Sequence, residues 1–251
     1  MLLQYIVLGI VQGLTEYLPI SSSAHLVITQ GFFNITGPEA VFLDITLHLG
    51  TLFAVLVFLF KDILKIANDK RILSFIAVST FITALIGFSG QIIIERMFSS
   101  MKLVTACLFI TGIILLATKN RVSGTRKESD IGIKDAALFG ITQGLAIMPG
   151  ISRSGITVST LLFRNVDREA AFRLSFMASI PVIALAFLFK LKDAHQAADI
   201  GALGLIAGFV ASFITGILAL KILFYMLKQA KFHWFGYYCI AVALVLTFWV
   251  R

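Results

Sequence analysis

Cysteine, proline and charged residues are all scarce in this chain. Its 251 residues include two cysteines and four prolines. Cys107 and Cys239 lie in apolar runs without neighbouring histidines, which argues against a structural disulfide and against a zinc site. Charged residues make up 14% of the chain, whereas soluble domains have about 25%. This shortage excludes a soluble enzyme, a disordered protein and a nucleic-acid module, so we expect no nucleic-acid partner.

Apolar residues dominate what is present. They make up 59% of the chain, and the mean hydropathy is +0.96. One globular core cannot bury so much apolar surface, so the composition predicts an all-α, polytopic membrane protein with a single membrane domain, 1–251. A transmembrane helix needs about 20 predominantly apolar residues. Charged segments separate six runs that we interpret as spans, at 40–60, 72–94, 103–118, 169–189, 200–227 and 234–250.

Two other apolar stretches are broken in the middle. Pro19 and Ser21–Ser23 interrupt 5–33, and Pro149-Gly150 with Ser152-Arg153-Ser154 interrupt 135–163. Each leaves two half-helices that are too short to cross a bilayer. Irregular backbone at membrane depth is tolerated only where protein buries it or where it lines a wet cavity. We therefore predict two re-entrant helical hairpins.

The two broken stretches resemble each other. At an offset of 131 residues, eight of the 16 positions in 9–24 and 140–155 are identical, with breakers and serines in register. Chance similarity between two apolar, glycine-containing helices is the alternative to duplication. Under duplication, repeat one is 1–118, the linker is 119–132 and repeat two is 133–251. Three spans per repeat would invert the second half in the membrane and place a site near the midplane, where the halves meet.

The basic residues predict an orientation. The net charge is +8, and 15 of the 21 lysines and arginines lie at 61–71, 119–135, 164–173 and 221–231, on one side of the predicted topology. Cytoplasmic loops are enriched in lysine and arginine. That side is therefore expected to be cytoplasmic and both termini to face outward. Arg153 is the one basic residue that this arrangement assigns to neither a loop nor a helix end.

Ionisable groups within apolar segments mark function by default. Glu16 ends the first half-helix, and Gln12 lies one turn earlier on the same face. A buried carboxylate can bind a divalent cation or move a proton, and we favour such a role for Glu16 over the alternative of a purely structural partner of Arg153. His25 is a candidate acid or base, or a packing residue. Asp44 and His48 could line the same cavity from the first span.

Serines surround both breaks. Ser21–Ser23, Ser152 and Ser154 suit the N-termini of the second half-helices, where free N–H groups and the helix dipole favour an anion. Serines can also merely cap broken backbone. Arg153 strengthens the functional interpretation, because its planar fork can bind phosphate through two hydrogen bonds.

Two strings are similar to the signatures of a known family. QGLTEYLPISSSAHL (12–26) and PGISRSGIT (149–157) resemble the two motifs of the undecaprenyl-diphosphate phosphatase family, also known for bacitracin resistance. The resemblance covers essentially the whole chain. It implies a multi-pass phosphatase of the bacterial inner membrane, with a site on the outer face and a divalent cation, Mg²⁺ or Ca²⁺. Such an enzyme converts undecaprenyl diphosphate to the monophosphate carrier for wall polymers. It would contact membrane lipids and a polyprenyl diphosphate, and a homodimer is a candidate assembly.

Residue roles follow from the resemblance by motif position. Glu16 and Arg153 would be catalytic, with Ser22 as nucleophile and His25 or water as alternatives. Glu16 would also hold the metal, with Asp44 as a candidate second ligand. The substrate-binding side chains would be Gln12, Ser21, Ser23, Ser152, Ser154 and Thr157. The chain departs from the family pattern at Gln12, often Glu, which weakens a two-carboxylate metal site. It departs again at Ser23-Ala24, which replaces the commoner Thr-Gly.

The same architecture supports a different class of function. Inverted repeats with broken helices are typical of transporters. A transporter or flippase of a lipid phosphate or an anion, with Glu16 as coupling site, is therefore the alternative. Release of free phosphate from a polyprenyl diphosphate distinguishes the two, because a transporter produces none.

Overall fold

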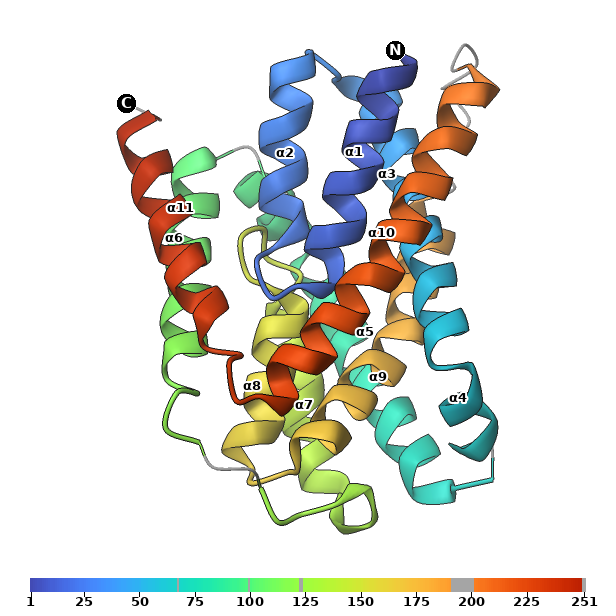
Figure 1. The fold of residues 1–251 in the computed structure, drawn as a ribbon, viewed down its shortest axis with the longest axis vertical. Coiled ribbons are helices and arrows are strands. Elements are labelled where there is room, and N and C mark those ends of the chain that lie inside the picture. Colours follow the sequence, from blue (N-terminus) through green and yellow to red (C-terminus); the bar gives the residue numbers. More distant parts are fainter. Residues whose placement is uncertain (67, 99, 122–123, 191–200, 250–251) are drawn as a thin grey trace.

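The computed structural model describes residues 1–66, 68–98, 100–121, 124–190 and 201–249 (Figure 1). Within these ranges the chain is helical and contains no named strand. The α-helices are α1 (Leu2–Tyr17), α2 (Ser22–Phe33), α3 (Gly37–Phe58), α4 (Phe60–Ile66), α5 (Lys70–Phe98), α6 (Met101–Leu116), α7 (Ile133–Leu145), α8 (Arg153–Phe163), α9 (Arg168–Lys190), α10 (Ala202–Lys228) and α11 (Trp234–Trp249). A single 3₁₀ turn, Glu128–Asp130, precedes α7.

A helical hairpin is present at each of the two predicted breaks, and its re-entrant position in the membrane stays a prediction. In the first, α1 ends at Tyr17, the chain turns through Ser21 at a φ of 67°, and α2 begins at Ser22. In the second, Gly150 makes the turn between α7 and α8 at a φ of 95°. A side chain at position 150 would collide with the Val104 carbonyl oxygen of α6, so this turn requires glycine.

Four helices are long and apolar enough to cross a membrane: α3, the 70–92 portion of α5, α9 and α10. The other two predicted spans correspond to α6 and α11, which are apolar helices of 16 residues each. The all-helical membrane architecture is therefore confirmed, and the count of six spans stays a prediction. The apolar surface of the long helices carries large exposed side chains such as Phe81, Phe88 and Ile214, as a lipid-facing surface requires.

The hairpins point at each other from opposite ends of the molecule. In Figure 1 the hairpin α1–α2 extends from the end of the molecule at which α1 begins and α11 ends, and α7–α8 extends from the other end. Their turns come together halfway along the long axis. The first half-helix of each hairpin crosses a long helix of the other half of the chain, α1 on α10 and α7 on α5.

Packing fixes the end of α1, where the first turn starts. Tyr17 is fully buried, donates its hydroxyl hydrogen to the Thr51 carbonyl oxygen and meets the Phe176 ring edge-on at 5.5 Å. Phe176 in turn packs against Phe172, with ring centroids 4.6 Å apart. These aromatic contacts of α9 belong to the main apolar core. The residue that follows Glu16 is thus immobilised by α3 and α9.

A buried ion cluster ties the linker to the second hairpin. The Asp135 carboxylate, 3% exposed, accepts hydrogen bonds from Arg126 at 2.6 and 3.1 Å and from Arg164 at 2.8 Å. Burial by itself would raise the pKa of Asp135, but the two guanidinium groups and the Gly132 amide outweigh it and hold this pKa well below its usual range. The cluster joins the beginning of α7 to the end of α8.

Candidate active site

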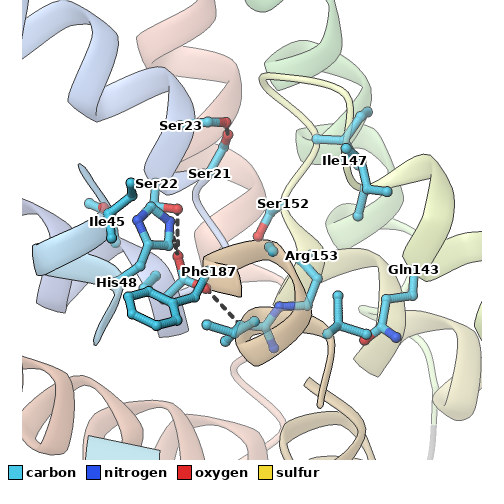
Figure 2. Close-up of a pocket in the computed structure, with 17 residues that line it drawn as sticks. Ser21, Ser22, Ser23, Ile45, His48, Gln143, Ile147, Ser152, Arg153 and Phe187 are labelled. Carbon is cyan, nitrogen blue, oxygen red and sulfur yellow. Dashed lines mark hydrogen bonds and ion pairs between the residues drawn. The ribbon is translucent and has the colours of Figure 1, made fainter. Parts of the chain in front are cut away.

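A cavity of about 210 Å³ lies where the two turns meet. Its polar wall consists of Thr15, Glu16, Ser21, Ser22, Ser23, His48, Gln143, Ser152 and Arg153. Its apolar wall consists of Ile45, Ala146, Ile147, Ile151, Val182, Ile183, Ala186 and Phe187. Both breaks therefore contribute to one site, as the sequence predicted. Figure 2 shows Ser22, His48 and Arg153 approaching one another across it, although they come from three different helices.

Glu16 is the centre of the polar wall. Its Oε1 accepts a hydrogen bond from Arg153 Nη2 at 2.8 Å, and its Oε2 accepts one from Ser22 Oγ at 2.7 Å. Gln12 Nε2 donates to Oε2 at 3.2 Å from one turn earlier in α1. Glu16 is thus the structural partner of Arg153 and also the neighbour of a hydroxyl group.

Arg153 retains unused hydrogen-bonding capacity. Its Nη2 is committed to Glu16, whereas its Nη1 is buried without a hydrogen-bond partner among the described residues. The guanidinium lies over the Phe176 ring, 5.7 Å from the centroid, which fixes its plane. A buried unpaired N–H group of a cation is costly. An anion in the cavity would satisfy it.

The serines connect the two turns. Ser21 Oγ and Ser23 Oγ are 3.1 Å apart, and Ser23 Oγ accepts a hydrogen bond from the Gly150 amide of the other turn at 3.4 Å. Ser152 caps α8 as predicted, with its Oγ accepting from the Gly155 amide at 3.2 Å. Ser21 occupies the N-cap position of α2, but its side chain makes no capping hydrogen bond. Its Oγ lies near Ser23 Oγ instead, and Ser21 is among the residues that line the cavity.

The short helices hold the turns in place. Thr111 of α6 donates to the Gly150 carbonyl oxygen at 3.0 Å and accepts from the Ser152 amide at 3.1 Å. Cys239 of α11 contacts the Pro19 carbonyl oxygen of the first turn, at 3.5 Å from its Sγ. Each break in the backbone is thus satisfied by a neighbouring helix, as buried polar backbone requires.

Three predicted substrate-binding side chains lie behind the cavity wall. Gln12 is fully buried beneath Glu16, and Ser154 is fully buried with its Oγ 3.2 Å from Ser152 Oγ. Thr157 Oγ1 donates to the Arg153 carbonyl oxygen at 2.7 Å and lies 2.8 Å from Ser175 Oγ. They orient the residues that do line the cavity.

His25 lies on the side of α2 that faces α11. Its Nδ1 is 2.8 Å from the Ser21 carbonyl oxygen and its Nε2 is 2.9 Å from the Tyr238 hydroxyl. The two rings are stacked, with centroids 5.8 Å apart. His25 is not among the residues that line the cavity. In this arrangement it orients the first turn through Ser21.

The cavity wall includes His48 and Gln143, neither of which was a predicted catalytic or substrate-binding residue. His48 Nε2 of α3 lies 3.7 Å from Glu16 Oε2. Its neighbour Asp44, the candidate second metal ligand, accepts from Gln30 at 2.8 Å and lies outside the cavity wall. Gln143 also lines the cavity. Its alignment with Gln12 in the internal repeat was the signal that could have identified it.

The described residues of the cavity provide too few ligands to bind a metal ion without ligands from the substrate. Within the described residues no group of three His, Cys, Asp or Glu side chains is placed to hold a metal ion. Among them, Glu16 is also the only carboxylate on the cavity wall. Mg²⁺ is commonly bound by one or two carboxylates together with substrate phosphates. The site therefore fits a cation that is shared between Glu16 and a bound diphosphate.

Comparison with known proteins agrees with this chemistry. A family model described as bacitracin resistance protein BacA matches residues 5–245. An undecaprenyl-diphosphatase of Desulforapulum autotrophicum is 40% identical, over 97% of this chain and 96% of the relative. One of Carboxydothermus hydrogenoformans is also 40% identical, over 94% and 92%, and one of Methanobrevibacter smithii is 35% identical, over 97% and 96%. The chain therefore belongs to the bacitracin resistance protein BacA family.

Proposed function

We propose that this chain hydrolyses undecaprenyl diphosphate to undecaprenyl phosphate and inorganic phosphate. The observation that carries the proposal is Arg153, which has one terminal nitrogen fixed by Glu16 and the other buried and unpaired, and which lines the same cavity as four serine side chains. A diphosphate supplies the acceptor oxygens that such a site lacks. The names of the relatives supply the substrate.

Binding would use the geometry of both turns. Arg153 Nη1 would donate to a phosphate oxygen while Nη2 stays on Glu16. The hydroxyls of Ser21, Ser23 and Ser152 would donate to the remaining oxygens. Phosphoryl transfer depends mainly on such positioning and on stabilising the charge of the transferred group. The apolar half of the cavity wall keeps bulk water away from these charged contacts.

The contact between Ser22 and Glu16 provides the chemical step. Glu16 would accept the hydroxyl proton over its 2.7 Å hydrogen bond while Ser22 Oγ attacks the terminal phosphorus. The bond to the bridging oxygen breaks, and the lipid monophosphate leaves. Water then hydrolyses the serine phosphoester and releases phosphate. Direct attack by water, activated by the same carboxylate, and attack by His25 are the alternatives.

A divalent cation, Mg²⁺ or Ca²⁺, is part of the proposal. Glu16 would hold it together with the phosphate oxygens. Its chemistry would be to neutralise the diphosphate and the charge that develops on the leaving oxygen.

The proposal includes the location and the orientation of the protein in the cell. We place the protein in the bacterial inner membrane, with both termini and the site on the outer face, as an inverted repeat of 1–118 and 133–251. Two glycines that are aligned in the internal repeat support the inverted repeat. A Cβ at Gly9 would meet backbone of α10, and one at Gly140 would meet backbone of α5, the equivalent helix of the other half. There the enzyme would recycle the lipid carrier for cell-wall synthesis, and a larger pool of monophosphate would confer bacitracin resistance.

Phosphate release by the purified protein tests the proposed function. Wild type should release phosphate from undecaprenyl diphosphate in detergent, whereas a transporter or flippase would release none. Ser22→Ala should lose most of the activity if Ser22 attacks, and His25→Ala should lose less, because His25 lies off the cavity wall. Ser74→Ala is the matched control, since Ser74 is exposed and bonds only to its own helix at the Lys70 carbonyl. A wild type without phosphate release would refute the proposal.

Attack by Ser22 would form a covalent intermediate. A serine phosphoester should be detectable on the α2 peptide after rapid quenching with acid. Hydrolysis without any such intermediate would assign the attack to water. The proposed homodimer is checked separately by measuring the protein mass of the detergent complex.

A further inference from the structure

A second cavity lies between α5 and α9, and we call it the α5–α9 groove. Its volume is about 170 Å³. Thr83, Ala84, Gly87 and Phe88 line it from α5 at the spacing of one helical face, and Leu185 contributes from α9. Most of its wall is aliphatic or aromatic. Such a wall suits a hydrocarbon chain and offers little to a charged ligand.

The groove adjoins the cavity of the candidate active site, which we call the phosphate cavity. Ile147, Val182 and Ala186 line both of them. These residues belong to the apolar wall of the phosphate cavity. A molecule with a charged head in the cavity and an apolar tail in the groove would therefore meet apolar side chains where the two adjoin.

The outer rim of the groove faces the surface where the bilayer would lie. Phe88 is 62% exposed, and its ring meets that of Phe189 at 5.5 Å. Leu185, on the same rim, is 46% exposed. The described part of the chain has another apolar groove, between α6 and α11, lined by Phe109 and Leu244 among others. That groove shares no lining residue with the phosphate cavity.

We propose that the first isoprene units of the polyprenyl substrate lie in the α5–α9 groove and that the rest of the chain passes between α5 and α9 into the bilayer. This inference rests on the proposed function, because it assigns the tail of the same substrate. It makes Ala84 and Gly87 determinants of how well a prenyl chain is accepted. Burial of apolar surface in the groove would supply binding energy that a bare diphosphate lacks.

Labelling gives a test that does not depend on turnover. A farnesyl diphosphate analogue with a diazirine on its prenyl chain is bound to the detergent-solubilised wild type, irradiated and mapped by peptide mass spectrometry. Label on the α5 and α9 peptides supports the proposal. Label confined to the α6 and α11 peptides overturns it.

Kinetics give the second test. Ala84→Phe fills the groove, and Leu85→Phe is the matched control, since Leu85 is the next residue, 57% exposed and outside the groove lining. For farnesyl diphosphate, Ala84→Phe should lower kcat/KM by at least about tenfold, the factor that losing roughly two buried methylene groups produces. For inorganic diphosphate, which has no prenyl chain, kcat/KM should not change.

The outcomes separate this inference from the proposed function. An equal loss with both substrates, or no loss with either, overturns the groove assignment while wild-type phosphate release stands. A wild type that releases no phosphate refutes the proposed function instead, and the position of the label then decides whether a prenyl diphosphate lies in the groove.

Discussion

Replacement of Arg153 by lysine should abolish most phosphate release and leave the protein folded. The guanidinium uses Nη2 to hold Glu16 at 2.8 Å and has its buried Nη1 free for the substrate. Lysine has a single ammonium group. This group would stay paired with the Glu16 carboxylate and would leave no second planar donor for a phosphate oxygen. Loss of one preorganised donor to developing charge lowers kcat by about 10²–10³-fold.

Lysine is the informative substitution because alanine would also disturb stability. The Glu16 side chain is 8% exposed and that of Arg153 is 14% exposed. Removing one member of a buried ion pair costs about 3–5 kcal/mol, because the other charge stays buried without a partner. Arg153→Ala should therefore lose activity for two reasons at once, whereas Arg153→Lys keeps the charge balance around Glu16.

The assay measures kcat and KM for phosphate release, together with the melting temperature of the detergent-solubilised protein. Arg168→Lys is the control, since Arg168 lies at the start of α9, donates to the Arg121 carbonyl oxygen at 3.0 Å and is not among the residues that line the cavity. Arg153→Lys should melt near the wild-type temperature with a strongly reduced kcat. Wild-type turnover by this variant would refute the assignment of Arg153 to the diphosphate.

Three further predictions concern the site and its scaffold. Asp135→Asn should lower the free energy of unfolding by about 2 kcal/mol, measured by thermal melting in detergent, because the 3% exposed carboxylate holds two arginines. Since its pKa is lower in the folded protein, this contribution exists above the unfolded pKa of about 4 and is lost as the pH falls through the folded pKa. Wild type and variant should therefore differ equally at pH values from neutral to weakly acidic, and a difference that vanished at neutral pH would contradict the argument. Gly13→Val should yield no folded protein, because a Cβ there would lie 2.5 Å from the Ser212 carbonyl oxygen, whereas Gly31→Ala, with open space around it, should express and melt like wild type. EDTA should stop phosphate release and Mg²⁺ should restore it, whereas Glu16→Gln should lower turnover by about 10²–10⁴-fold and respond to neither treatment; full Mg²⁺ activation of this variant would remove Glu16 as the metal-binding residue.

The amino-acid pattern determined where the backbone breaks. Pro19 and the Pro149-Gly150 pair interrupt apolar stretches, and the structure turns at both places. Proline and glycine act through local sterics, which do not depend on the rest of the fold. Helix capping is also local, because the Ser152 side chain bonds to an amide three residues later, so Ser152 could be identified as a helix cap from the sequence.

The pairing of Glu16 with Arg153 was also foreseeable. The two residues are 137 positions apart, but each is an ionisable group in an apolar stretch and each lies beside a break. A low-dielectric interior accepts few such groups unless they meet. That requirement limits the choice of partners strongly.

Tertiary structure alone decided which side chains line the cavity. His25 is in a motif and turns toward Tyr238, whereas His48 is outside both motifs and faces Glu16. Gln12 lies beneath Glu16, whereas Gln143, its counterpart in the repeat, lines the cavity. Successive residues of a helix point about 100° apart, so the sequence fixes which residues share a face. The angle at which α1, α2, α3 and α7 pack then decides which face borders the cavity, because that angle depends on contacts between segments far apart in the chain.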